Sequence, residues 1–311
     1  MSVTPDPSSL VSAVASGDRR ALARLISILE DRREGHDALL PLAFRAAVPS
    51  HRIGITGSPG AGKSTLTDGL INIIRATGEP VAVLAVDPTS PFSGGAVLGD
   101  RVRMQDHVLD DGVYIRSMAS RGHLGGLSAG APKALLALET AAFPIVIVET
   151  VGVGQDEVEI AAAADTVIVV VTPGWGDGVQ AAKAGVLEIG DVFVVNKADR
   201  PGADEAVADL RAMLALGTRS DWEPPIIQTV ATKGAGIDEV WKAIETHREH
   251  LGPDGLDAVR RERRRAELET ALVEILRERA SAMAKSGGDV VGAVEAGDLD
   301  PWTGAGTLAG E

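Results

Sequence analysis

A glycine-rich stretch, GITGSPGAGKST at residues 54–65, contains residue types that handle phosphate. It fits the pattern G-x-x-x-x-G-K-[ST], in which glycine backbone N–H groups surround phosphate oxygens and the lysine neutralises their charge. The hydroxyl that follows the lysine can ligate Mg²⁺. A β-branched run precedes the stretch and a helix-forming run follows it, so the helix N-terminus adds a favourable dipole. The stretch therefore predicts a site for a nucleoside triphosphate and Mg²⁺. The residues predicted to contact the nucleotide are Gly57, Ser58, Pro59, Gly60, Ala61, Gly62, Lys63, Ser64 and Thr65.

A second motif, NKAD at residues 196–199, follows a later β-branched run and points to the base. The carboxylate of Asp199 can accept hydrogen bonds from the ring N–H and the exocyclic amine of guanine. Adenine offers no such pair and would leave the carboxylate unsatisfied. The stem of Lys197 can lie against the base plane, and the loop at 229–236, TVATKGAG, offers backbone N–H groups to the guanine carbonyl. We therefore expect GTP and GDP rather than ATP. The residues predicted to read the base are Asn196, Lys197, Asp199, Thr232 and Lys233.

Two β-branched runs end in carboxylates, Asp87 in VAVLAVD and Glu149 in IVIVE. Ligands of parallel sheets bind at the carboxyl ends of the strands, so both acids are expected on the Ser64 side of the nucleotide. Mg²⁺ takes few direct protein ligands and keeps several waters, which Asp87, Glu149 and Asp100 could hold. The alternative role for Asp87 is a helix N-cap or a solvated turn. The same alternative carries more weight for Asp100, which lies in a polar stretch.

The segment ETVGVGQ at 149–155 bears on hydrolysis. The backbone N–H of Gly152 is placed to sense the γ-phosphate, and Gly154 leaves the loop free to move. Many GTPases carry a glutamine directly after this glycine to orient the attacking water. Here that position is Val153, which cannot do so, and the spacing leaves open whether Gln155 reaches. We therefore predict slow intrinsic turnover.

The elements around these motifs follow an α/β pattern. Short β-branched runs alternate with Ala/Leu-rich helical stretches from residue 51 to residue 250, which predicts a doubly wound, mostly parallel sheet. Hydrophobic residues make up 45% of the chain but aromatic residues only 3%, so the core must consist of Val, Leu, Ile and Ala. The expected strands are RIGITG, VAVLAVD, VYIRSM, IVIVET, TVIVVVT, DVFVVNK and PIIQTVAT.

Helical segments flank this domain on both sides. Residues 1–50 are expected to form an N-terminal helical layer, with Asp18 capping one helix and 36–46 forming another. Gly252-Pro253 marks a break between the α/β domain and a C-terminal helical segment, 251–311. Its long helix carries one apolar face, at Leu268, Leu272, Ile275 and Leu276.

Composition excludes several classes. A net charge of −14 argues against a broad basic surface for nucleic acid, so no nucleic-acid partner is expected. The absence of cysteine excludes disulfides, thiolate metal sites and a cysteine nucleophile. Neither a cleavable signal sequence nor a membrane-spanning stretch is recognisable, and we expect a cytoplasmic protein without membrane contact. His247 and His250, the one pair with metal-like spacing, are expected at a solvated helix end.

Together these motifs resemble the methylmalonyl-CoA mutase-associated GTPases of the MeaB/ArgK type. The resemblance rests on GSPGAGKST, AVDPTSPFSGGAVLGDRVRM, RGHLGGLS, VIVETVGVGQDE, GWGDGVQAAKAG, VVNKAD and GDLDPW. It implies a slow GTPase that binds GTP/GDP and Mg²⁺ and forms homodimers through C-terminal helices. It further implies association with an adenosylcobalamin-dependent acyl-CoA mutase, whose cofactor loading the protein gates and which it protects from inactivation.

The resemblance also implies roles for single residues. Lys63 and Ser64 handle phosphate and metal, and a metal and switch shell is formed by Ser64, Asp87, Asp100 and Glu149. Lys183 lies in a segment, 174–188, that communicates with the mutase. The residues implied in catalysis are Lys63, Asp87, Glu149 and Lys183.

Three other functions are compatible with a phosphate loop. A nickel- or cobalt-insertion GTPase would carry Cys/His clusters, which a chain without cysteine argues against. A GTP-loaded adaptor would bind its partner without turnover. An ATP-dependent small-molecule or transport-associated kinase would prefer ATP, and Asp199 argues against that preference.

Overall fold

The computed structural model describes residues 6–87, 107, 109–119, 130–150, 156–174, 188–216 and 221–310. The chain divides into two compact units, Met1–Val259 and Arg260–Glu311.

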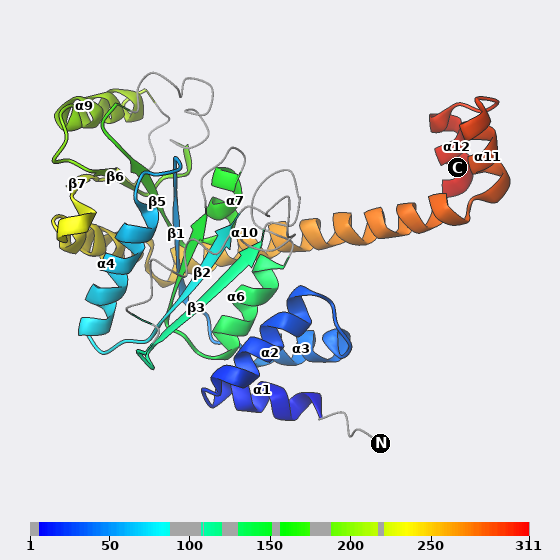
Figure 1. Ribbon diagram of the computed structural model, residues 1–311, viewed down its shortest axis with the longest axis horizontal. Coiled ribbons are helices and arrows are strands. Elements are labelled where there is room, and N and C mark those ends of the chain that lie inside the picture. The colour runs from blue at the N-terminus through cyan, green and yellow to red at the C-terminus, as the bar shows by residue number, and fades with distance from the viewer. Residues whose placement is uncertain are drawn as a thin grey trace. The chain divides into compact units, whose positions relative to one another are not determined.

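The first unit contains a seven-stranded sheet with strand order β3-β2-β4-β1-β5-β6-β7 (Figure 1). Every strand pair is parallel, so the predicted doubly wound α/β fold is confirmed. The strands are β1 (His51–Gly57), β2 (Val81–Asp87), β3 (Val113–Ala119), β4 (Ile145–Thr150), β5 (Thr166–Val171), β6 (Val192–Asn196) and β7 (Ile226–Thr229). They coincide with the seven β-branched runs of the sequence. All residues of β1, β4, β5 and β6 are buried, as expected of strands covered on both faces.

Helices cover both faces of this sheet. On one face, α4 (Lys63–Ala76) and the first part of α10 (Ile237–Ser286) pack on the isoleucine- and valine-rich side of β1, β2, β4, β5 and β6. On the other face, α6 (Ala131–Thr140), α7 (Asp156–Ala163) and α9 (Ala203–Leu214) bury their apolar sides. The connection after β1 runs through α4 and the connection after β4 runs through α7, on opposite faces. The carboxyl ends of these two neighbouring strands therefore border the crevice in which ligands of such sheets bind.

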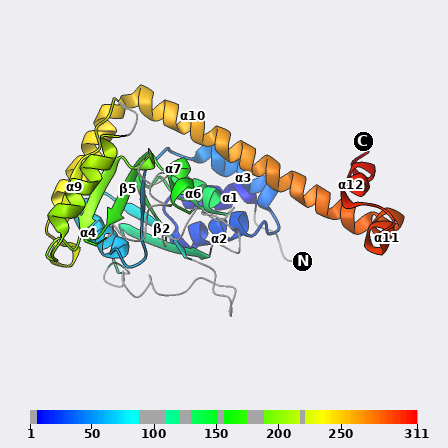
Figure 2. The same ribbon diagram turned by 90° about the horizontal axis from the view of Figure 1, so that it is seen from above.

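A three-helix layer precedes β1 and packs against α6 (Figures 1 and 2). Its members are α1 (Pro7–Ala15), α2 (Arg19–Glu30) and α3 (His36–Ala46). Asp18 caps α2 as predicted, because its carboxylate accepts from the N–H groups of Arg20 and Ala21. Sequence reasoning missed α1, although Asp6 is its N-cap and a proline opens it.

A chain of buried polar side chains lies at the amino ends of the strands, whereas Glu149 lies at the carboxyl end of β4. His51 Nε2 lies 3.0 Å from Thr166 Oγ1, which lies 2.9 Å from His247 Nδ1, and His247 Nε2 lies 3.4 Å from Asp191 Oδ1. Trp222 packs against the rings of both His247 and His250. The expectation that His247 lies at a solvated helix end is wrong, since only 4% of the residue is exposed.

Burial shifts the pKa values of two side chains in this buried polar chain, His247 and Asp191. It lowers the pKa of His247 to about 4, with a smaller contribution from the nearby His250. Burial also raises the pKa of Asp191 to about 6, against the opposing effect of the Val167 N–H that donates to it. His247 is therefore neutral at pH 7, with Nδ1 accepting from the Thr166 hydroxyl and Nε2–H facing Asp191.

The second unit contains the rest of α10 together with α11 (Gly288–Ala296) and α12 (Pro301–Ala309). Within α10, Gly252 departs from helical geometry with φ 58° and ψ −174°, at the predicted break. The apolar face at Leu268, Leu272, Ile275 and Leu276 is exposed in the single chain. α11 and α12 pack closely, because a Cβ at Gly304 would approach Val294 Cγ2 to 2.8 Å (Figure 2). Among the described helices, none combines the length and the apolar character that crossing a membrane requires.

Candidate functional site

The phosphate-loop motif forms a strand–loop–helix turn. β1 ends at Gly57, and α4 begins at Lys63. Gly57 and Gly62 have φ values of 133° and 96°, which L side chains rarely adopt. A Cβ at Gly57 would lie 2.0 Å from the Val170 carbonyl oxygen, and one at Gly62 would lie 2.3 Å from Asn196 Nδ2. Only glycine fits these two positions, so the motif glycines serve the local path of the loop.

Lys63 turns back over this loop. Its Nζ donates to the carbonyl oxygens of Gly57 and Ser58, at 2.7 and 3.1 Å, and only 6% of the residue is exposed. The ammonium is thereby held at the N-terminus of α4, where Gly62 supplies no capping side chain. A positive charge beside the first N–H groups of a helix is a typical arrangement for binding phosphate.

Glu149, the carboxylate at the end of β4, reaches the same helix. Its Oε1 accepts from Ser64 Oγ at 2.6 Å and its Oε2 accepts from Thr67 Oγ1 at 2.9 Å. All three residues are buried. A carboxylate and a hydroxyl in contact at a strand end are oxygen donors of the kind that Mg²⁺ prefers, so this donor set fits the implied metal. Sequence reasoning missed Thr67, although its i, i+3 spacing from Ser64 places both on one helix face.

The other predicted metal and switch residues are described only in part. Asp87 is the last residue of β2 and lies at the same sheet edge as Glu149, because Ala85 pairs with Glu149 in the register. Nothing is described of its side chain. Asp100, Gly152 and Lys183 lie outside the described residues.

Asn196 connects the phosphate loop to the predicted base-side loop. Its Nδ2 donates to the Ala61 carbonyl oxygen at 2.8 Å. Its Oδ1 accepts from Thr229 Oγ1 and from the backbone N–H of Ala231, both at 3.1 Å. Only 3% of the residue is exposed. The structure therefore brings the two nucleotide motifs together through one buried amide.

The remaining base-reading candidates lie at the rim of this arrangement. Lys197 has a φ of 60°, and its Nζ donates to the Gly60 carbonyl oxygen at 2.6 Å. Asp199 Oδ2 lies 3.2 Å from Lys233 Nζ, and both side chains are well exposed. Thr232 and Lys233 lie in the 3₁₀ turn η2 (Ala231–Lys233). The Lys233 N–H donates to the Val230 carbonyl oxygen, so this one of the two predicted backbone donors is engaged within its own loop.

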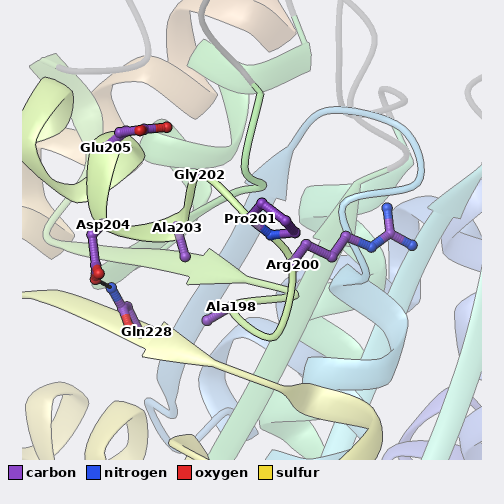
Figure 3. Close-up of a pocket in the computed structure, with 8 residues that line it drawn as sticks. All are labelled: Ala198, Arg200, Pro201, Gly202, Ala203, Asp204, Glu205 and Gln228. Atoms are coloured by element: carbon purple, nitrogen blue, oxygen red, sulfur yellow. Dashed lines mark hydrogen bonds between the residues drawn. The ribbon is translucent and has the colours of Figure 1, made fainter.

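A shallow polar pocket of about 300 Å³ lies beside the NKAD motif (Figure 3). Gln228 Nε2 donates to Asp204 Oδ1 at 2.8 Å across it. Neither Asp199 nor any phosphate-loop residue lines the pocket, so it adjoins the base motif and is separate from the loop. The lining residues are Ala198, Arg200, Pro201, Gly202, Ala203, Asp204, Glu205 and Gln228.

Comparisons with known proteins identify relatives of this chain. A family model described as methylmalonyl Co-A mutase-associated GTPase MeaB matches residues 22–286. A Pyrococcus horikoshii protein whose name assigns it to the GTPases is 46% identical over 301 residues, covering 95% of each chain. GTPase ArgK of Escherichia coli is 38% identical over 244 residues, covering 75% of this chain and 73% of ArgK.

A mouse relative and a solved structure extend the comparison. The Mus musculus protein named methylmalonic aciduria type A homolog, mitochondrial, is 32% identical over 272 residues, covering 81% of this chain and 66% of that protein. A crystal structure named LAO/AO transport system kinase superposes with a TM-score of 0.72 at 28% identity, covering 99% of this chain and 98% of that one. With the family model spanning most of its length, the chain belongs to the methylmalonyl Co-A mutase-associated GTPases of the MeaB family and is a P-loop GTPase.

Proposed function

We propose that this protein binds GTP and GDP with Mg²⁺, hydrolyses GTP slowly, and serves as a chaperone that gates adenosylcobalamin loading of an acyl-CoA mutase and protects that mutase. The observation that carries the nucleotide part is the bond from Asn196 to Ala61, because it fixes the base motif relative to the phosphate loop. The family description and the name of the mouse relative support the mutase, with methylmalonyl-CoA mutase as the expected partner.

In the proposed complex, Lys63 exchanges its two loop carbonyl partners for phosphate oxygens. The exchange replaces neutral acceptors with charged ones, so that both donor and acceptor of each hydrogen bond are then ionised. Asp199 turns from Lys233 to the guanine N–H groups, which its exposure allows. Gly57, Ser58, Pro59, Gly60, Ala61, Gly62 and Thr65 line the phosphates in this proposal.

Ser64 and Glu149 would hold the metal, with Asp87 and Asp100 completing the proposed shell. Mg²⁺, when bound there, neutralises charge on the phosphate oxygens. Val153 offers no side chain that could orient the attacking water, and Gln155, two residues further on, is the remaining candidate in this loop. The rate of the free protein is therefore expected to be low, and to rise when the mutase contacts the 174–188 segment around Lys183.

A homodimer is proposed through the second unit. The exposed face of α10 at Leu268, Leu272, Ile275 and Leu276 is apolar, and such faces are typical of helix–helix interfaces.

The test compares GTP and ATP hydrolysis by the purified full chain, alone and with methylmalonyl-CoA mutase. We expect slow release of phosphate from GTP, little from ATP, and a faster rate with the mutase. Equal rates with and without the mutase would remove the gating role while leaving the GTPase intact. Preferred turnover of ATP, with phosphate transferred to a small molecule, would instead favour a transport-associated kinase, as in the name of the solved relative.

A further inference from the structure

Thr67 is a buried hydroxyl that no nucleotide motif of this sequence includes. It lies on α4, three residues after Ser64, and none of its surface is exposed. Its Oγ1 donates to Glu149 Oε2 at 2.9 Å, while Ser64 Oγ donates to Oε1 at 2.6 Å. The two oxygens of one carboxylate are thus held by hydroxyls from one face of the phosphate-loop helix.

The two hydroxyls differ in what else they must do. In the proposed function, Ser64 gives its oxygen to Mg²⁺, so its present bond to Glu149 has to be rearranged when the nucleotide binds. Thr67 lies one turn further along the helix and its bond can persist. At the level of Glu149, the neighbouring strand positions are Ile55 in β1 and Ala85 in β2, whose side chains cannot take over a hydrogen bond.

We propose that Thr67 is a positioning residue for the metal site, whose hydroxyl fixes the carboxylate of Glu149 so that Oε1 faces Ser64. The proposal rests on the proposed function, because it concerns the same Mg²⁺ site. Removing the hydroxyl leaves a buried carboxylate oxygen without this donor, and a hydrogen bond to a charged group contributes more than a neutral one. The carboxylate is then held less firmly in the orientation in which it serves the metal.

The test uses the full chain with three substitutions. Thr67→Val keeps the shape and removes the hydroxyl, and Thr67→Ser restores it. Thr140→Val is the matched control, because Thr140 is also buried and donates to the Leu136 carbonyl oxygen in α6, on the other face of the sheet. The readouts are Mn²⁺ binding to the GDP complex, followed by electron paramagnetic resonance, and the Mg²⁺ concentration that half-maximally slows GDP release.

For Thr67→Val we expect about tenfold weaker Mn²⁺ binding and about tenfold more Mg²⁺ for the half-maximal effect. GDP affinity in the presence of a chelator should stay at the wild-type value, because the phosphate loop and the base motif are untouched. Thr67→Ser should recover most of the metal affinity, and Thr140→Val should lose stability alone. A Thr67→Val protein with wild-type metal dependence, or one that loses GDP affinity equally with and without metal, would overturn the proposal.

Two outcomes separate this proposal from the proposed function. If the wild-type chain shows no Mg²⁺-dependent retention of GDP, the proposed metal-dependent GTPase site fails. If the wild type shows it and Thr67→Val matches the wild type, only the role of Thr67 fails. Should Thr67→Val not fold, Thr67→Cys replaces it, since a thiol is a weaker donor. It must then give a smaller shift in the same direction, and no shift would overturn the proposal.

Discussion

The side-chain amide of Asn196 donates to the Ala61 carbonyl oxygen at 2.8 Å, across 135 residues of sequence. The same amide accepts from Thr229 and from the Ala231 N–H, so one residue connects the phosphate loop, β7 and the loop that follows β7. This connection explains why the base motif requires an asparagine at its first position. A carboxylate there could not donate to Ala61.

Asn196→Ala should therefore damage both the fold and the nucleotide site. It removes three hydrogen bonds from a buried position, which should lower the free energy of unfolding by about 3 kcal/mol. GDP affinity should fall more than tenfold, because the phosphate loop loses its fixed place relative to the base loop. Chemical denaturation and GDP titration measure the two effects. Asn72→Ala is the control, since Asn72 lies on the exposed side of α4 and donates to the Asp68 carbonyl oxygen, four residues earlier in the same helix. Unchanged GDP affinity in Asn196→Ala would contradict the connection.

Asp199→Asn should relax base selectivity and leave the fold intact. Its carboxylate is well exposed and lies 3.2 Å from Lys233 Nζ, and an exposed ion pair of this kind contributes little stability. An amide can accept one of the two guanine hydrogen bonds but meets the other donor with its own N–H group, so discrimination between GTP and ATP should fall by about 100-fold. Competition of GTP and ATP for a fluorescent GDP analogue gives the ratio. Asp204→Asn in the adjacent pocket should leave it unchanged. Selectivity that survives Asp199→Asn would remove the base assignment.

The fold followed from the sequence because its central strands, among them β1, β4, β5 and β6, are buried on both faces. Such strands must be apolar, mostly β-branched runs, and these runs together with those of the remaining strands predicted the seven-stranded sheet. The segment 251–311 was expected to be helical, but α11 and α12 were not predicted individually. Their sequences, GDVVGAVEA and PWTGAGTLA, contain several glycines and no clear apolar period.

Site residues could be predicted where they belong to a motif of fixed spacing. Residues whose role depends on the packing of distant segments could not be predicted as well. The loop glycines and Lys63 carry their geometry in the sequence, since neighbouring residues form it. Thr67 shares a helix face with Ser64 through its i, i+3 spacing, but its role depends on that face of α4 turning towards β4, which the local sequence does not determine. His247 resembled a surface histidine because the groups that bury it, on Trp222, Thr166 and Asp191, come from distant parts of the chain.

Arg52 and Glu139 form a buried ion pair at the amino edge of the sheet, and breaking it should cost more than removing it. Arg52 Nε donates to Oε1 at 3.0 Å and Nη2 to Oε2 at 2.9 Å, with 5% and 9% of the two side chains exposed. Arg52→Ala leaves Glu139 as a buried charge, which should lower the free energy of unfolding by about 3–5 kcal/mol. Arg52→Met combined with Glu139→Leu should cost clearly less. Urea unfolding of the single and double variants tests this, and a double variant less stable than Arg52→Ala would contradict it.

Two single variants in the buried polar chain that links the side chains of His51 and Asp191 should change the pH dependence of stability in opposite directions. The pKa of His247 is lowered to about 4, so its contribution to stability is present above pH 6.5 and is lost as the pH falls through 4. The pKa of Asp191 is raised to about 6, so its contribution is present below pH 3.8 and is lost as the pH rises through 6. Between about pH 4 and about pH 6 the two trends oppose each other, and the wild-type profile should be nearly flat in this respect.

His247→Gln keeps a donor for Asp191 and an acceptor for Thr166 but removes the imidazole titration. Relative to wild type, its free energy of unfolding should rise as the pH falls from about 7 to about 4, by about 3 kcal/mol. Asp191→Asn should do the reverse and lose stability on acidification, besides a constant cost because its amide faces the Val167 N–H. The slope with pH in urea unfolding is therefore the quantity to compare. A double variant should regain the wild-type slope, since both opposing contributions are then absent. Parallel slopes for the two single variants would show that His247 and Asp191 do not titrate as the buried chain requires.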